Sequence, residues 1–224
     1  MKEPVKYLTK AQFSGSLVIA ITIFAGLGVF ASSRESGTFL NLFHLDRELN
    51  FTTLFSAFLL VANGWFLYRI HLLHGPLPAP IRFLGFIFLF MGADECLKIH
   101  ETAERLTGID WQLLYLPLIA AAGFGWLRFA ITQRGLQLLL WILGAVAWGS
   151  SQLLEAVQWN WGGGIQIANY LSMMIGEEIL EMSGSACFLV TLFDRLKHGA
   201  ENLKENHDQP SRPGFSRSMK TAVR

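Results

Sequence analysis

The sequence predicts an all-α fold, a polytopic integral membrane bundle of six transmembrane helices. The chain has 224 residues, of which 52% are hydrophobic and only 16% are charged, whereas a water-soluble domain usually has about 25% charged residues. Apolar runs of about 20 residues, enough to cross a bilayer as a helix, recur between short polar breaks. No basic stripe is interleaved with aromatic residues, so we expect the lipid bilayer as a partner and no nucleic acid.

The apolar runs and their breaks define the six predicted spans. Prolines within residues 74–80 end the second run, because proline removes a helical hydrogen bond and clashes with the preceding turn. A Thr-Gly-Ile-Asp turn precedes the fourth run, and three consecutive glycines separate the last two. The third span is expected to continue as a helix toward Arg105. The predicted spans are residues 13–32, 51–70, 81–98, 111–130, 136–159 and 165–193.

The positions of lysine and arginine predict the orientation, because short cytoplasmic loops are the basic ones. The more basic side holds Lys2, Lys6, Lys10, Arg69, Arg82, Arg128, Arg134, Arg195 and Lys197, and the other side holds Arg34, Arg47, Lys98 and Arg105. Both termini are therefore predicted to be cytoplasmic. Residues 1–195 form the transmembrane domain, and residues 196–224 form a polar, basic tail with too few apolar residues to become ordered. Trp111, Trp159 and Trp161 fit an aromatic belt on the outer side.

Acidic and amide side chains gather in the outer half of this predicted topology. They come from four separate segments, at residues 46–50, 94–104, 152–158 and 177–181. Ionisable groups at membrane depth are costly and usually mark an ion pathway, a metal site or a structural ion pair. The candidate metal-binding residues are Asp46, Glu48, Asn50, Asp94, Glu95, His100, Glu101, Glu155, Glu177, Glu178 and Glu181.

Helical spacing groups these residues further. If the third span stays helical, Asp94, Lys98 and Glu101 share one face, and Glu178 and Glu181 share a face of the last span. Carboxylates this close in a low dielectric cannot all ionise unless a cation neutralises them. Many carboxylates with one histidine favour a divalent metal ion, either calcium, manganese or iron. The sequence lacks the Glu-x-x-His pair of helix-bundle di-iron sites, so the identity of the metal stays open.

Simpler structural roles are open for some of these residues. Asp94 and Lys98 fit an i, i+4 ion pair that neutralises a helix end. Glu101 fits a solvated extension of the helix above the bilayer, and Glu155 fits an exposed interfacial position. The three glutamates at 177–181 are harder to explain in this way, because they lie deep in a span without a basic residue nearby.

Three segments resemble known families. LDRELNFTTLFS at 45–56, ADECLKIHE at 93–101 and GEEILEMSG at 176–184 resemble a group of bacterial multipass membrane proteins without an established function. This resemblance implies one site, formed by the acids, His100 and Asn50, in a bacterial inner membrane. The Glu-Leu-Asn segment that ends at Asn50 also resembles the Glu-x-Asn calcium segment of alkaline ceramidases, which are multipass zinc amidases. The Ser-x3-His and His-x3-His zinc ligands of that family are absent from this sequence.

Three functions are consistent with these patterns. The leading interpretation is a metal-dependent membrane enzyme that acts on a lipid or another apolar small molecule, with Glu178 as the catalytic base toward metal-bound water. The alternative is a cation- or proton-coupled transporter or channel that uses the same acids as relays. The third is an accessory subunit of a larger membrane complex, stabilised by a structural calcium ion.

Overall fold

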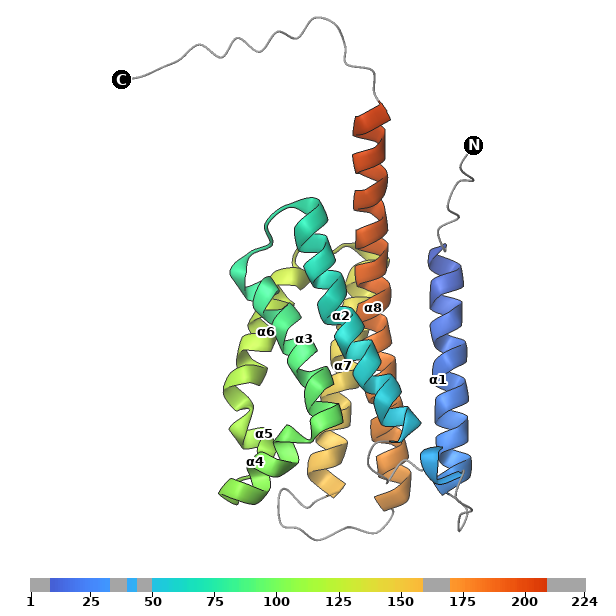
Figure 1. Cartoon of the computed structure of the whole chain (residues 1–224), viewed down its shortest axis with the longest axis vertical. Coiled ribbons are helices and arrows are strands. Elements are labelled where there is room, and N and C mark those ends of the chain that lie inside the picture. The colour runs from blue at the N-terminus through green and yellow to red at the C-terminus, as the bar shows by residue number, and fades with distance from the viewer. Residues whose placement is uncertain (1–8, 33–39, 44–49, 159–169, 209–224) are drawn as a thin grey trace, which may run out of the picture.

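The structure is a computed structural model that describes residues 9–32, 40–43, 50–158 and 170–208. These residues form eight α-helices and one short 3₁₀ helix, and this part of the chain contains no strand. The all-α prediction is confirmed. The elements are α1 (Lys10–Ser32), η1 (Leu40–Phe43), α2 (Phe51–His74), α3 (Ala79–Leu97), α4 (Ile99–Thr107), α5 (Trp111–Leu114), α6 (Leu116–Ala130), α7 (Gly135–Gln158) and α8 (Tyr170–Asp208) (Figure 1).

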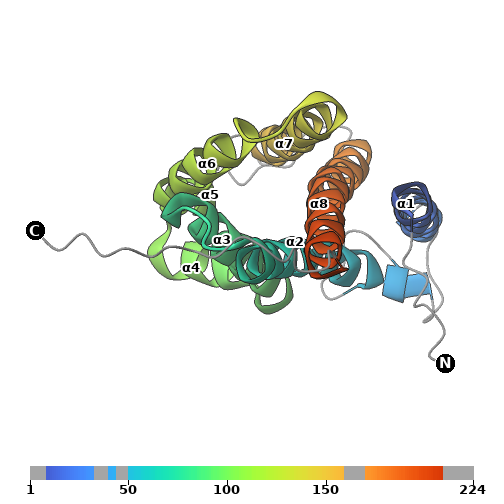
Figure 2. The ribbon, with the colours of Figure 1, turned by 90° about the horizontal axis from the view of Figure 1, so that it is seen from above.

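The long helices surround a shared interior. Seen from above, α6, α3, α2, α8 and α7 form a ring of ribbons, and α1 stands outside it beside α8 (Figure 2). Helix α8 packs against α7, α2 and α1, while α3 packs between α2 and α6. The α2–α3 turn lies at one end of the bundle, with the last turns of α8 extending beyond it, and α4 and α5 lie at the opposite end (Figure 1). We call these the inner and outer ends, following the predicted orientation.

Three helices are long and apolar enough to cross a membrane: α1, α2 and α7. Helix α6 is apolar but has only 15 residues. Helix α3 ends in Asp94 and Glu95, and α8 has three glutamates in its first turns. Length and composition therefore support a membrane protein with three candidate spans. Among the other helices of the predicted bundle, α6 is shorter than these spans, and α3 and α8 carry acids.

Glycines allow the closest approaches between helices. A Cβ added to Gly64 of α2 would lie 2.7 Å from the carbonyl oxygen of Gly85 in α3. A Cβ added to Gly144 of α7 would lie 2.6 Å from Cε1 of Phe188 in α8. Carbon atoms do not approach this closely, so any side chain at either position would push the helices apart.

The hydrophobic core lies toward the inner end of the ring. Trp141, Phe129 and Leu192 are fully buried there, and the ring centroids of Trp141 and Phe188 are 4.7 Å apart. Such burial excludes water and fixes the positions of α6, α7 and α8 relative to one another. The core therefore provides a rigid base for the side chains at the outer end.

A polar network ties three helices together at the inner end. The Lys10 ammonium of α1 lies 2.9 Å from a carboxylate oxygen of Asp194 in α8, and the Gln137 amide of α7 donates a hydrogen bond to the same oxygen. The rings of Phe13 and Phe193 stack beside this network, with centroids 4.1 Å apart. We call Lys10, Gln137 and Asp194 the inner latch.

The structure corrects two expectations about helix continuity. The third predicted span does not continue as one helix toward Arg105, because Lys98 adopts a left-handed conformation (φ 54°, ψ 45°) that ends α3 and starts α4. Helix α8 does not end near residue 196, since it continues to Asp208. The first part of the predicted disordered tail is therefore helical, and residues 209–224 lie outside the described residues.

Candidate functional site

The site is built around the break between α3 and α4. Because Lys98 turns the chain, His100 folds back onto Asp94. The two carboxylate oxygens of Asp94 accept hydrogen bonds from the backbone N–H of His100 at 2.9 Å and from its ring Nδ1 at 2.8 Å. The Tyr115 hydroxyl donates a third hydrogen bond to Asp94 at 3.2 Å. Asp94 is completely buried, and these three donors compensate for its loss of water.

This arrangement orients the His100 ring. Nδ1 carries the proton that Asp94 accepts, so Nε2 is the ring atom left to bind a metal or to exchange a proton. Burial alone would lower the pKa of His100, but the hydrogen bond and charge of Asp94, together with the charges of Glu95 and Glu155, raise it above its ordinary value. The ring packs beside Trp111, with centroids 5.1 Å apart. His100 is therefore a positioned imidazole that favours the charged form.

Five glutamates from three helices face one another next to His100. Their carboxylates are within electrostatic range: Glu181 interacts with the other four, and Glu178 interacts with Glu95 and Glu155. Among the described residues, His100 is the group whose positive charge interacts with Glu95 and Glu155. We call Glu95 of α3, Glu155 of α7 and Glu177, Glu178 and Glu181 of α8 the carboxylate cluster.

Hydrogen-bond donors hold three members of the cluster in place. Glu155 accepts from the Trp111 indole at 3.0 Å and from the Gln112 amide at 3.4 Å. Glu181 accepts from the Gln152 amide at 3.1 Å, and Glu177 accepts from the Gln158 amide. No hydrogen bond from another described side chain reaches Glu178.

An apolar cleft borders the cluster. It has a volume of about 530 Å³ and is lined mainly by apolar residues of α3, α5, α6 and α7. Its polar wall consists of Trp111, Gln112, Tyr115 and Gln152. Each of these four residues donates a hydrogen bond to an acid of the site. The four polar residues that a molecule in the cleft would contact are therefore also the donors that orient Asp94, Glu155 and Glu181.

The other predicted site residues lie apart from this arrangement. Glu101 is half-exposed, and its carboxylate pairs with the Lys98 ammonium at 2.9 Å. The expected Asp94–Lys98 pair is wrong, because the break at Lys98 gives Asp94 the His100 ring as its partner instead. Asn50 is the N-cap of α2, and its side-chain oxygen accepts from the Thr53 N–H at 2.8 Å. Asp46 and Glu48 lie outside the described residues.

As the side chains stand, the described residues contain no group of three or more His, Cys, Asp or Glu that could hold a metal ion. The cluster is close enough for electrostatic interaction, yet its carboxylates do not converge on a common point. The metal site therefore stays a prediction, and binding would require side-chain rotations that bring the oxygens together.

Sequence reasoning missed the aromatic and amide donors of the site. Trp111 was expected in an interfacial belt, but it is 9% exposed and bonded to Glu155. Tyr115 is also buried, and its ring meets that of Trp111 edge-on with centroids 5.5 Å apart. The signal in the sequence was the i, i+4 spacing of Trp111 and Tyr115, which places both rings on one face where a helix starts after the Asp110 N-cap.

Comparison with known proteins places this arrangement in a family. A family described as a domain of unknown function (DUF8692) matches residues 15–196. No curated protein and no solved structure matches the chain. The matched residues include the inner core, the break at Lys98 and the whole carboxylate cluster. Because the match covers most of the sequence, the chain belongs to the DUF8692 family.

Proposed function

We propose that this chain is a membrane enzyme that uses the carboxylate cluster, with a divalent cation, to act on a lipid or another apolar small molecule. One observation carries the proposal. An imidazole oriented by a buried carboxylate stands next to five glutamates, at the edge of an apolar cleft large enough for a small molecule. Apolar walls with a few placed polar groups are typical of sites that bind hydrophobic substrates.

The proposal includes six membrane crossings and cytoplasmic termini in a bacterial inner membrane. Two of the candidate spans, α2 and α7, lie in the ring with α3, α6 and α8, and the third, α1, packs beside α8 (Figure 2). In this arrangement the acids of α3 and α8 face the interior of the bundle, where ionisable groups in membranes are usually found. The lysines and arginines at the inner end support the orientation.

The chemistry of the cluster fits a hard cation. Glu95, Glu155 and Glu178 are the groups that would hold it, and Asp94 would fix the ring of His100 beside them. A bound cation would neutralise the cluster and polarise a water molecule or a substrate oxygen. Calcium, manganese and iron are the candidates, because oxygen ligands dominate the site.

The proton steps can be assigned to residues of this chain. Glu178 is the cluster carboxylate that no described side chain restrains with a hydrogen bond, so it is the candidate base. His100 is held beside the cluster in a form that favours the proton, so it is the candidate acid. Neither group lines the cleft itself, but Trp111 does, and its ring packs beside His100.

Metal analysis of the detergent-purified full chain tests this proposal. We expect about one or two equivalents of divalent metal per chain, as in helix-bundle carboxylate sites, and their removal by a chelator. Glu178→Gln should lower the retained metal and abolish metal-dependent product formation from a total polar lipid extract, measured by mass spectrometry. Glu104→Gln is the matched control, because Glu104 lies in α4 outside the cluster. Absence of bound metal, or an unaffected Glu178→Gln variant, would contradict the enzyme.

A second candidate function, cation or proton transport, has one observation in its favour. Below Glu181 by one helical turn, Ser185 is fully buried, and the Asn63 amide donates to its carbonyl oxygen at 2.9 Å. The Asn63 side-chain oxygen and the Ser185 hydroxyl are buried without a hydrogen-bond partner in the described residues. These groups extend the polar path inward from the cluster, so ion flux in vesicles that disappears in Glu181→Gln would favour transport over catalysis.

A further inference from the structure

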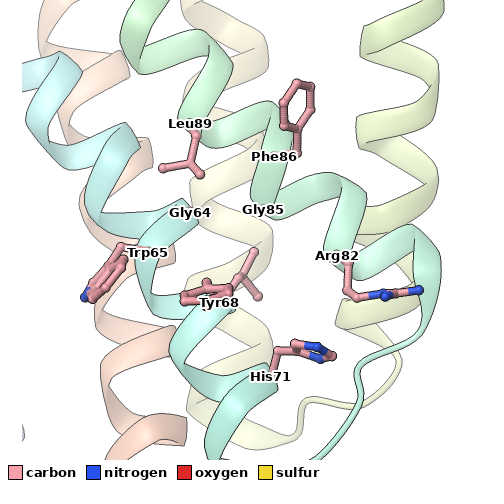
Figure 3. A pocket seen from close by; sticks show the side chains of 9 residues that line it. Gly64, Trp65, Tyr68, His71, Arg82, Gly85, Phe86 and Leu89 are labelled. Atoms are coloured by element: carbon pink, nitrogen blue, oxygen red, sulfur yellow. The ribbon is translucent and has the colours of Figure 1, made fainter.

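A second hollow lies between α2 and α3, toward the inner end and away from the carboxylate cluster. It has a volume of about 500 Å³. Its lining includes Tyr68, His71 and Arg82 toward the α2–α3 turn, and Trp65, Phe86 and Leu89 further along the two helices (Figure 3). We call it the α2–α3 groove. It is a separate site from the one proposed for catalysis and does not depend on that chemistry.

The end of the groove near the turn offers hydrogen-bond donors and positive charge. Nδ1 of His71 accepts a hydrogen bond from the backbone N–H of Leu77 at 3.0 Å, so its proton is on Nε2. Arg82 is exposed, and no ion pair or hydrogen bond joins its guanidinium to another described residue. Figure 3 shows both side chains on the same side of the groove, next to the turn. This end can therefore donate to an anion with at least two groups.

No acid of the hairpin competes for these donors. The sequence from residue 51 to residue 93 contains Arg69, Arg82 and two histidines but no aspartate or glutamate. Asp194, also toward the inner end, already pairs with Lys10 at 2.9 Å. The positive charge beside the groove is therefore not compensated within the hairpin, and an anion from outside is its natural partner.

The other end of the groove is lined by apolar side chains. Trp65 is 51% exposed and Phe86 is 57% exposed, so their rings face outward on the bundle surface. Gly64 and Gly85 are buried where α2 and α3 pack together, so the hollow lies over the line where the two helices meet (Figure 3). A hollow with one charged end and one apolar end, on the outside of a membrane bundle, matches a molecule that has an anionic head and a hydrocarbon chain.

We propose that the α2–α3 groove binds an anionic phospholipid of the inner leaflet. The phosphate lies between the Arg82 guanidinium and the Nε2–H of His71, and one acyl chain lies in the hollow between Trp65 and Phe86. Arg82 binds the phosphate oxygens through paired hydrogen bonds. It favours anionic over zwitterionic headgroups, because the ammonium group of a zwitterionic lipid neutralises the phosphate and repels the guanidinium.

Lipid retention measured by native mass spectrometry tests this site. The full chain is purified in detergent and exposed to phosphatidylglycerol or phosphatidylcholine with the same acyl chains. We expect the wild-type chain to retain phosphatidylglycerol at least about fivefold better, the factor typical of one basic residue at a membrane surface. Arg82→Gln should remove this preference, and Arg82→Lys should recover part of it.

Arg128→Gln is the matched control, because Arg128 is an exposed arginine of α6 outside the groove. It should keep the preference for phosphatidylglycerol. The proposal fails if Arg82→Gln retains the preference, or if Arg128→Gln loses it equally, which would indicate diffuse attraction. It also fails if inorganic phosphate displaces the lipid completely, which would identify a free-phosphate site. Thermal unfolding of each variant checks that the lost preference does not come from a misfolded chain.

Discussion

At the inner end of the bundle one buried carboxylate has several partners, whereas at the outer end five carboxylates share one histidine. Asp194 is bonded to Lys10 and Gln137, and His198 lies 3.7 Å away. The cluster around Glu178 has amide and indole donors, but His100 is its positive group among the described residues. The paired carboxylate at the inner end stabilises the fold. The five carboxylates at the outer end raise the free energy of the folded chain unless a bound ligand neutralises them. Local conflicts of this kind are expected at functional sites.

The largest effect should come from Asp94. Asp94→Ala leaves the His100 backbone N–H, its ring and the Tyr115 hydroxyl without their shared acceptor in a buried position. We expect a loss of about 3–5 kcal/mol in the free energy of unfolding, the usual effect of breaking a buried charged network. Unfolding of the purified chain by sodium dodecyl sulfate measures it.

Tyr115→Phe is the control for this change, because it removes one donor and leaves Asp94 bonded to His100. It should cost about 1 kcal/mol. Equal losses in the two variants would mean that the Tyr115–Asp94 hydrogen bond, and not the pairing of Asp94 with His100, holds the site together.

The next largest effect should come from the inner latch. Burial alone would raise the pKa of Asp194, but hydrogen bonds from Gln137 and Lys10, with the charges of Lys10 and His198, lower it below its ordinary value. The stabilisation is therefore fully present above the ordinary aspartate pKa and is lost as the pH falls through the lowered one. Asp194→Asn should cost about 1–3 kcal/mol at neutral pH, and the difference from wild type should shrink below about pH 4.

The same variant sharpens the comparison between the two ends. Asp194→Asn should leave metal retention at the outer end unchanged, because Asp194 lies three to four helical turns from Glu181 in α8 at about 3.6 residues per turn. A fall in retained metal would show that the latch supports the site as well as the fold.

The smallest effect should come from the break at Lys98. A non-glycine residue in the left-handed region is strained, so Lys98→Gly should be more stable than Lys98→Ala by about 1 kcal/mol. Both variants lack the ammonium that pairs with Glu101, so the comparison isolates the backbone. Thermal unfolding of the two variants measures it, and a more stable alanine variant would mean that the chain straightens at this position.

Most of the fold could be predicted from the sequence, because apolar length, prolines and glycines act locally. The expected spans at 51–70 and 136–159 correspond closely to α2 and α7. The break at Lys98 could not be predicted, because lysine is an ordinary helix residue and its left-handed conformation is imposed by the contacts of His100 with Asp94. The helical continuation of α8 to Asp208 was not predicted, because the polar composition of residues 196–224, with few large apolar residues, is typical of a disordered segment.

The candidate site could be predicted in part. The gathering of acids at one end followed from topology, and the structure brings Glu95, Glu155 and the three glutamates of α8 within electrostatic range. The roles within the site depend on tertiary contacts, so Asp94 changes from an expected ligand to the residue that orients His100. Gln112 carries no charge and follows no spacing pattern, so the sequence gave no signal for its role.

Helix α8 has a mechanical consequence. Its 39 residues, at about 1.5 Å each, form a rod of about 58 Å, whereas the hydrocarbon layer of a bilayer is about 30 Å thick. The glutamates of the cluster are near one end of this rod, Asp194 is further along it, and the last turns project beyond the α2–α3 turn (Figure 1). A stiff rod moves as a unit, so an axial shift at Glu178 reappears at Asp208. A label on the projecting end would therefore report events in the carboxylate cluster from the opposite end of the bundle.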